Sequence, residues 1–442
     1  MSGRIGRLFD MTTTNSPRPL GDWGRGQAFA EGRHFVSEFN FVPEVTSGYE
    51  IPTPLGLIDS TIRKVIYTVG VRPSEAELLE ICHILEELGI EEESLNVWWR
   101  DGEPDPQELA AAMTIARAKV KFKVNVFTDT LLGNGETPMP LMKQTVDMFA
   151  EAGIKLLNPG LLQAPNDDAR KRQADEMAVM NEYIKAAGME WNATIANCGR
   201  RNFDEFMALC NTAVDNGVRR FDLMDSTSAL SPQAMTHYVR TFRSRLNRPT
   251  PLTMHTHDDF GMDTAGTIAA VLAGASPDVA LNGVSYRSGF AALEEVVVAL
   301  DVLYGVDTGI RLDRLKWASD ELARVMRFPV PPLKPVVGSH QFLREGPPDI
   351  DKILDGRAPA DFANMGGSYS PELIGAEFHW VFSQQGNSQV VASVARSLGL
   401  TLTDKQVAEA VTILEAKLAA HPAYPRWATP DEVFAVVKRV AG

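Results

Sequence analysis

The sequence is poor in cysteine, in basic charge and in long apolar runs. Its 442 residues include three cysteines without CxxC spacing, which is typical of reduced thiols and excludes a disulfide framework. There are 43 Lys and Arg residues against 57 Asp and Glu, a net charge of −14, whereas nucleic-acid binders usually carry a basic face. No run of 18 apolar residues and no signal-type segment occurs. We therefore expect a cytoplasmic protein with neither a nucleic-acid nor a membrane partner.

Several familiar catalytic motifs are missing as well. The chain has no Walker-type phosphate loop, no GxSxG elbow and no zinc-ribbon cysteine pattern. An acidic surface still permits a locally basic pocket, so a small anionic substrate is compatible with the composition.

Short runs rich in β-branched residues alternate with amphipathic stretches from residue 57 to about residue 305. This pattern is typical of βα units and a parallel sheet. Eight such units predict an α/β protein with a (β/α)₈ TIM barrel, whose chemistry lies at the C-terminal ends of the strands. The strands are expected at 57–65, 93–99, 120–127, 154–160, 189–195, 219–225, 251–257 and 278–284.

The chain extends beyond the expected barrel at both ends. We expect an N-terminal arm at 1–55, a catalytic barrel at 56–305, and a linker with small helical subdomains at 306–442. An arm and a linker of this kind favour a homodimer whose domains cross between subunits.

The clearest chemical signal is His255-Thr256-His257 at the end of the seventh expected strand. Alternate residues of a strand point to the same face, so both imidazoles project into the barrel mouth. Such a pair suits a divalent transition metal and suits general acid–base catalysis equally well.

A second signal is the cation pair Arg63-Lys64 at the end of the first expected strand. The arginine would bind a substrate carboxylate or enolate oxygen bidentately, and the lysine would act as a point charge. Weaker signals are polar residues near the ends of other strands, which we expect to bind substrate: Asn158, Ser226, Asn282 and Arg287.

Together these segments resemble the DRE-TIM metallolyase superfamily, in particular its isopropylmalate synthase and homocitrate synthase branch. The segment IDSTIRKVI is similar to the family's first strand, HTHDDFG to its H-x-H-N-D-x-G motif, and NGVSYRSGFAALEEV to its eighth region. The resemblance covers roughly residues 55–440, without the regulatory domain of isopropylmalate synthases.

The resemblance implies a Claisen-type condensation between an acyl-CoA and a 2-oxo acid chelated by a divalent metal (Zn, Mn or Mg). Arg63 matches the arginine that stabilises the enolate oxygen, and His255 and His257 match two metal ligands. The acidic ligand after the arginine is Lys64 here, and Asn96, which we expect to bind substrate, takes the place of a glutamate. The family's linker histidines correspond to Arg344 and Asp349.

Asp59 cannot take over as the acidic ligand if residues 57–65 form one strand. It would lie about 16 Å below Lys64, at about 3.3 Å per residue.

Three hypotheses remain open. In the first, the chain is a carbon–carbon bond-forming or -cleaving enzyme without the usual metal, in which Lys64 is an electrostatic clamp or a Schiff-base nucleophile. In the second, His255, His257 and a carboxylate such as Asp258 still bind a metal for acyl transfer. In the third, the chain is a pseudoenzyme subunit.

Overall fold

The computed structural model describes residues 28–132, 137–162, 166–421 and 425–442. Residues 1–27 of the expected arm lie outside these ranges. The chain divides into two compact units, one of residues 46–301 and 306–329 and the other of residues 1–45, 302–305 and 330–442. None of the helices in the described ranges combines the length and apolar character that a membrane crossing requires.

The first unit is a closed parallel barrel, which confirms the predicted fold. Its sheet order is β10-β11-β12-β13-β3-β4-β7-β8-β9, and the pairing of β10 with β8 closes it. The strands are β3 (Ile58–Asp59), β4 (Glu92–Val97), β7 (Lys123–Leu132), β8 (Leu156–Leu161), β9 (Glu190–Trp191), β10 (Ala193–Ile195), β11 (Phe221–Asp225), β12 (Leu252–Thr256) and β13 (Ser276–Val279).

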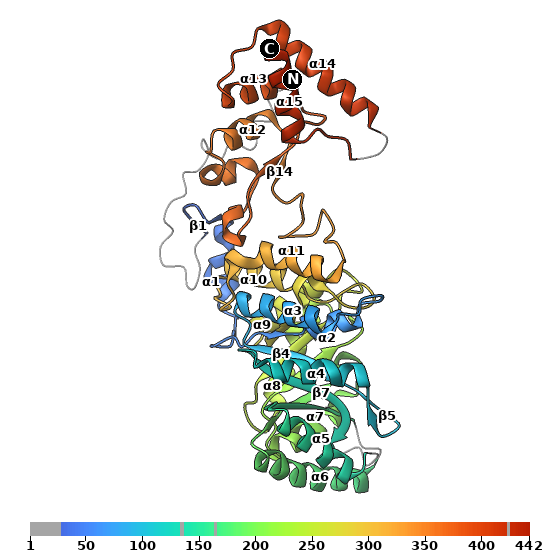
Figure 1. Ribbon diagram of the computed structural model, residues 1–442. Helices are drawn as coiled ribbons and strands as arrows, with labels where there is room; N and C mark the ends of the chain where they lie inside the picture. Colours follow the sequence, from blue (N-terminus) through green and yellow to red (C-terminus); the bar gives the residue numbers. More distant parts are fainter. Residues whose placement is uncertain (1–27, 133–136, 163–165, 422–424) are drawn as a thin grey trace. The chain divides into compact units, whose positions relative to one another are not determined.

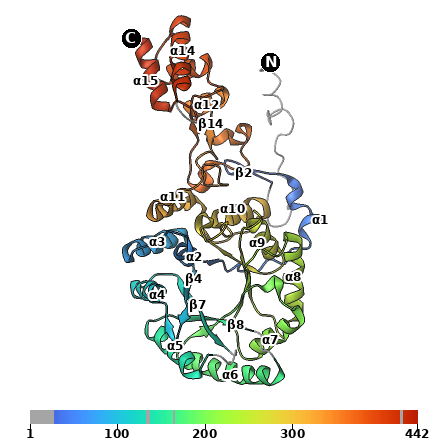
Figure 2. The same ribbon diagram turned by 90° about the vertical axis from the view of Figure 1, so that its right-hand side faces the viewer.

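Helices alternate with these strands and surround them, as Figure 2 shows for α4 to α9. They are α2 (Thr61–Tyr67), α3 (Glu75–Leu88), α4 (Pro106–Ala118), α5 (Met139–Glu151), α6 (Asp167–Ala186), α7 (Phe203–Asp215), α8 (Pro232–Arg245), α9 (Asp263–Leu272), α10 (Leu293–Tyr304) and α11 (Leu315–Met326). Local sequence explains their ends: α3 begins with a capping box of Ser74 and Glu77 and ends at left-handed Gly89.

Two of the expected strands end well before the predicted residue. The first strand ends at Asp59, and α2 begins at Thr61, so Arg63 and Lys64 lie on a helix. The carboxylates of Asp59 and Glu93 accept the backbone N–H groups of Thr61 and Ile62 at 2.9 Å each, which supports a helix start that local β-propensity does not predict. The 16 Å separation inferred for Asp59 therefore does not apply.

The eighth strand is also shorter than expected at its end. It stops at Val279, and residues Leu281–Gly283 form a 3-10 helix in which Asn282 has a φ of 62°. Asparagine tolerates this left-handed conformation better than most residues, which is why the chain can turn there.

The second unit contains a helical core of α12 (Pro347–Leu354), α13 (Ser388–Ser397), α14 (Asp404–Ala420) and α15 (Pro430–Ala441), labelled in Figure 1. Buried Ile350, Val390, Leu414 and Val433, one from each helix, pack together between them. Its short strands are β1 (Phe29–Ala30) with β2 (His34–Phe35) and β14 (Leu343–Arg344) with β15 (His379–Trp380). The helix α1 (Pro43–Thr46) follows the N-terminal pair.

The interior of the barrel carries a buried ionic network. Arg220, 6% exposed, donates to Glu92 Oε1 at 2.6 Å and to Asp222 Oδ1 at 2.7 Å. Arg219 is 30% exposed and contacts the other oxygen of Glu92 at 3.3 Å. Arg220 thus joins two buried carboxylates, whereas Arg219 contacts only one of them.

Replacing Arg220 with Met should destabilise the barrel far more than replacing Arg219 with Met. Removing one partner of a buried ion pair costs about 3–5 kcal/mol because the other charges stay buried, whereas an exposed pair contributes about 1 kcal/mol or less. Urea denaturation measures both free energies of unfolding. An equal loss of unfolding free energy in the two variants would show that Arg220 stabilises the barrel no more than Arg219 does.

Candidate active site

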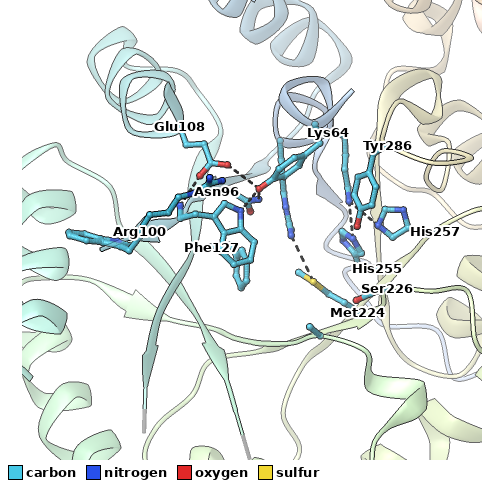
Figure 3. A pocket seen from close by; sticks show the side chains of 15 residues that line it. Lys64, Asn96, Arg100, Glu108, Phe127, Met224, Ser226, His255, His257 and Tyr286 are labelled. Atoms are coloured by element: carbon cyan, nitrogen blue, oxygen red, sulfur yellow. Dashed lines mark hydrogen bonds between the residues drawn. The ribbon is translucent and has the colours of Figure 1, made fainter. Parts of the chain in front are cut away.

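Strand β12 brings His255 and His257 to the mouth of the barrel. Both side chains are almost fully buried, and their ring centroids lie 5.4 Å apart. Figure 3 shows the two rings on the same side of a cavity as Lys64 and Tyr286. The alternation of the strand predicted this common orientation.

The Nδ1 atom of each imidazole already has a hydrogen-bond partner in the protein. His255 Nδ1 lies 2.5 Å from Asp278 Oδ2, and His257 Nδ1 lies 3.1 Å from the carbonyl oxygen of Gly289. A carbonyl oxygen only accepts, so Nδ1 of His257 carries the proton and its Nε2 is left with a lone pair. An ionised Asp278 likewise only accepts, so Nδ1 of His255 carries the proton and its Nε2 has the lone pair.

Asp278 was not among the residues expected at the site, although it supports His255. Strand register places the two residues side by side on β12 and β13, and Ser60 Oγ donates to the other carboxyl oxygen at 2.7 Å. Burial raises the pKa of Asp278 to about 7. Because strand register is a tertiary property, the local sequence carried no signal for this pair.

Helix α2 places Lys64 between the two imidazoles. Its Nζ lies 3.0 Å from His255 Nε2 and 3.4 Å from His257 Nε2, and 4.2 Å from the ring centre of Phe290. Burial, and then the nearby charge of Arg63, hold the pKa of Lys64 well below its usual value. Burial, and then the charge of Lys64, lower the pKa of His257 to about 3. The same two causes lower the pKa of His255.

This donor set does not fit a divalent metal. Lys64 Nζ occupies the place toward which both Nε2 lone pairs point, and a protonated Lys64 would repel a divalent ion by several kcal/mol at about 4 Å. Asp258 Oδ1 instead accepts from the backbone N–H of Asp263 at 3.4 Å. Within the described ranges, no three His, Cys, Asp or Glu side chains are grouped as metal ligands would be.

Arg63 lines the same cavity and has no carboxylate within ion-pair distance among the described residues. It is 6% exposed, its Nη2 lies 3.9 Å from Met224 Sδ, and its Nε has no hydrogen-bond partner there. The guanidinium also lies 5.1 Å from the ring centre of Phe127. A buried guanidinium without an acidic partner leaves a place for an anionic ligand.

The cavity has a volume of about 520 Å³. Of the expected site residues, it brings together Arg63, Lys64, Asn96, Ser226, His255 and His257. Figure 3 shows Arg100, Glu108 and Asn96 across the cavity from the histidines. Six residues from helix α2 and from the ends of strands β4, β11 and β12 thus meet at one mouth of the barrel.

Three expected substrate-binding residues do not line this cavity, and their side chains bond to protein groups instead. Asn158 donates to Asp222 in the barrel interior at 2.6 Å. Asn282 donates to the Ser319 carbonyl at 2.9 Å, and Arg287 holds both oxygens of Asp259 at 2.9 Å.

A hydrogen-bonded cluster around Tyr67 was not foreseen. The phenol donates to Glu108 Oε1 at 3.0 Å and accepts from Asn96 Nδ2 and Trp98 Nε1. Because Tyr67 has one proton, the amide nitrogen of Asn96 must face it, which leaves the buried Oδ1 of Asn96 without a partner. The only sequence signal was the pair Trp98-Trp99 before Asp101-Gly102, a turn-forming dipeptide.

The family's linker positions, Arg344 and Asp349, lie in the second unit. Arg344 is in β14 and donates to the carbonyl oxygens of Gln341 and Leu343, and Asp349 is in α12.

Comparison with known proteins supports the resemblance that the motifs predicted. Residues 140–321 match the family described as HMGL-like. Homocitrate synthase AksA of Methanopyrus kandleri is 28% identical over 85% of this chain and 91% of its own length. The (R)-citramalate synthase CimA of Methanocaldococcus jannaschii is 25% identical over 87% of this chain and 74% of its own length.

A solved structure shares the fold. An HMG-CoA lyase from Acinetobacter baumannii, in complex with coenzyme A and 3-methylmalate, aligns with a TM-score of 0.50 at 18% identity. The alignment covers 62% of this chain and 92% of that one.

Replacing Lys64 with Glu should create a metal site. Two histidines and a glutamate are a ligand set of catalytic zinc sites, so we expect about one zinc ion per chain in Lys64→Glu purified with added zinc. The unaltered protein and the uncharged Lys64→Gln control should hold far less by elemental analysis. Stoichiometric zinc in the unaltered protein would contradict the description of Lys64 as the group that fills this place.

Proposed function

We propose that this chain, whose barrel carries an HMGL-like domain of the DRE-TIM metallolyase superfamily, is an enzyme that forms or cleaves a carbon–carbon bond of a 2-oxo acid. The observation that carries the proposal is the buried amine of Lys64, held between two imidazoles beside the unpaired guanidinium of Arg63. The resemblance to homocitrate and isopropylmalate synthases implies an acyl-CoA as the second substrate, and we include it in the proposal.

Arg63 binds the substrate carboxylate. Its planar guanidinium matches a carboxylate bidentately, and burial strengthens the charge-assisted hydrogen bonds. This contact places the 2-oxo carbon next to Lys64, which lines the same cavity. Asn96 Oδ1 and the Ser226 hydroxyl are further substrate contacts.

Lys64 reacts as a neutral amine. Such an amine has two N–H donors, which match the two Nε2 acceptors, and one lone pair, which stays free to attack a carbonyl carbon. In the attack a bond forms between Nζ and the 2-oxo carbon. Both amine protons pass by way of the imidazoles to the oxygen, which leaves as water when its bond to carbon breaks, and a neutral imine remains.

The imine withdraws electrons from C3, the carbon next to the imine carbon, so that C3 can lose a proton. A histidine moves a proton from C3 to the imine nitrogen, and the enamine so formed attacks the thioester carbon of the acyl-CoA. The carbon–sulfur bond breaks, the departing CoA thiolate takes the proton from the nitrogen, and a neutral imine remains for hydrolysis. Carbon–carbon cleavage follows the same steps in reverse. His255 and His257 suit this role because both imidazoles are neutral and their Nε2 atoms lie 3.0 and 3.4 Å from Lys64 Nζ, where the proton has to be moved. The homodimer and the cytoplasmic location stay predictions.

Reduction with cyanoborohydride in the presence of pyruvate should attach the three-carbon acid to Lys64, detectable by peptide mass spectrometry. Only the unprotonated amine attacks, so labelling should rise with pH and reach its plateau well below pH 10.5, the ordinary pKa of lysine. Lys64→Arg and Lys64→Met are the controls and should not be labelled. An unlabelled Lys64 over the whole pH range would rule out the imine.

Replacing Arg63 with Met should raise the Kd of pyruvate about 10- to 100-fold, because a hydrogen bond to a charged group contributes about 1.5–3 kcal/mol. Arg100→Met removes an exposed cation from the rim of the same cavity and should change the Kd about threefold or less. Calorimetric titration gives both constants. Equal effects would indicate that Arg63 is not the carboxylate site.

A further inference from the structure

Five aromatic residues line the cavity, and we call them the aromatic wall: Tyr67, Trp98, Trp99, Phe127 and Tyr286. Phe127 is buried, whereas the other four are half-buried. They line the cavity that also holds Arg63 and Lys64, so the part of a substrate that extends beyond these two residues contacts the wall.

A β-hairpin carries the tryptophans to the cavity. Strand β5 (Trp99–Arg100) pairs with β6 (Glu103–Pro104), and the turn between them uses Asp101 and Gly102 at φ values of 54° and 83°. The hairpin is fixed at its base, because Asp105 N donates to Trp98 O at 2.6 Å and Trp98 N donates to Glu108 Oε2 at 2.7 Å.

Four rings of the wall pack edge to face in two pairs. Trp98 lies edge to face with Phe127 at 5.1 Å, and its indole nitrogen donates to Tyr67. Tyr286 and Tyr67 are also edge to face, at 6.1 Å. Aromatic rings prefer such edge-to-face or offset contacts and gain energy from them beyond the area that they bury.

The size of the cavity favours a substrate larger than a three-carbon acid. Its volume of about 520 Å³ lies in the range of pockets that enclose drug-sized ligands, so pyruvate would fill only a small part of it. We propose that the substrate is a 2-oxo acid with an aromatic side chain, whose carboxylate binds Arg63 and whose ring packs against the wall. This inference rests on the proposed function at Arg63 and Lys64.

Calorimetric titration of the full chain with three 2-oxo acids tests the inference: pyruvate, 4-methyl-2-oxopentanoate and phenylpyruvate. The unaltered protein should bind phenylpyruvate about tenfold or more tightly than pyruvate, and more tightly than the aliphatic acid. Trp99→Leu should lose this preference while its Kd for pyruvate stays unchanged, and Trp99→Phe should keep most of it. Trp317→Leu, a tryptophan on α11 outside the cavity, is the matched control and should behave as the unaltered protein.

The outcomes separate this inference from the proposed function. Equal affinity for the three acids, with binding still dependent on Arg63, would overturn the aromatic side chain and keep the 2-oxo acid. A preference for 4-methyl-2-oxopentanoate over phenylpyruvate would do the same. Binding of none of the acids would overturn both proposals. A Trp99-dependent preference for phenylpyruvate without an adduct on Lys64 would keep the substrate class and overturn the imine.

Discussion

The site depends on the two hydrogen bonds between Lys64 Nζ and the histidine Nε2 atoms. They form because Asp278 and the Gly289 carbonyl engage the opposite nitrogen of each ring and so set the tautomers. They also require helix α2 to begin where it does, directly after a two-residue strand, which brings the amine down to the imidazoles. Strands β3, β12 and β13 and helix α2 therefore contribute to a single contact.

An amine in this place changes what the barrel mouth can do. A metal ion polarises a carbonyl through its charge alone, whereas an amine with a free lone pair can form a bond to the carbonyl carbon. Both strategies draw electrons away from the neighbouring carbon, and both need an anchor for the substrate carboxylate. This explains why Arg63 and the histidine pair are compatible with a lysine at the position of the acidic ligand.

The sequence predicted the barrel and the meeting of Arg63 with His255 and His257, because strand alternation and barrel topology are regular. It did not predict the start of α2, since IDSTIRKV is rich in β-branched residues and the carboxylate of Glu93, which accepts from Ile62 N, is 31 residues away. Asn158, Asn282 and Arg287 bond to groups 64, 37 and 28 residues away, which no local pattern shows. Long-range partners decide which polar side chains remain available to a substrate.

A buried acid pair supports the start of helix α2. Asp59 and Glu93 are neighbours across β3 and β4, both are fully buried, and each uses one oxygen to accept a backbone N–H of the helix. Burial raises the pKa of Asp59, and burial together with the charge of Asp59 raises that of Glu93 well above its usual range. A proton retained by the pair removes the repulsion between two buried carboxylates at this short separation, so both groups can stay beneath the helix. The pair thus holds the first turn of α2, and with it the position from which Lys64 reaches the imidazoles.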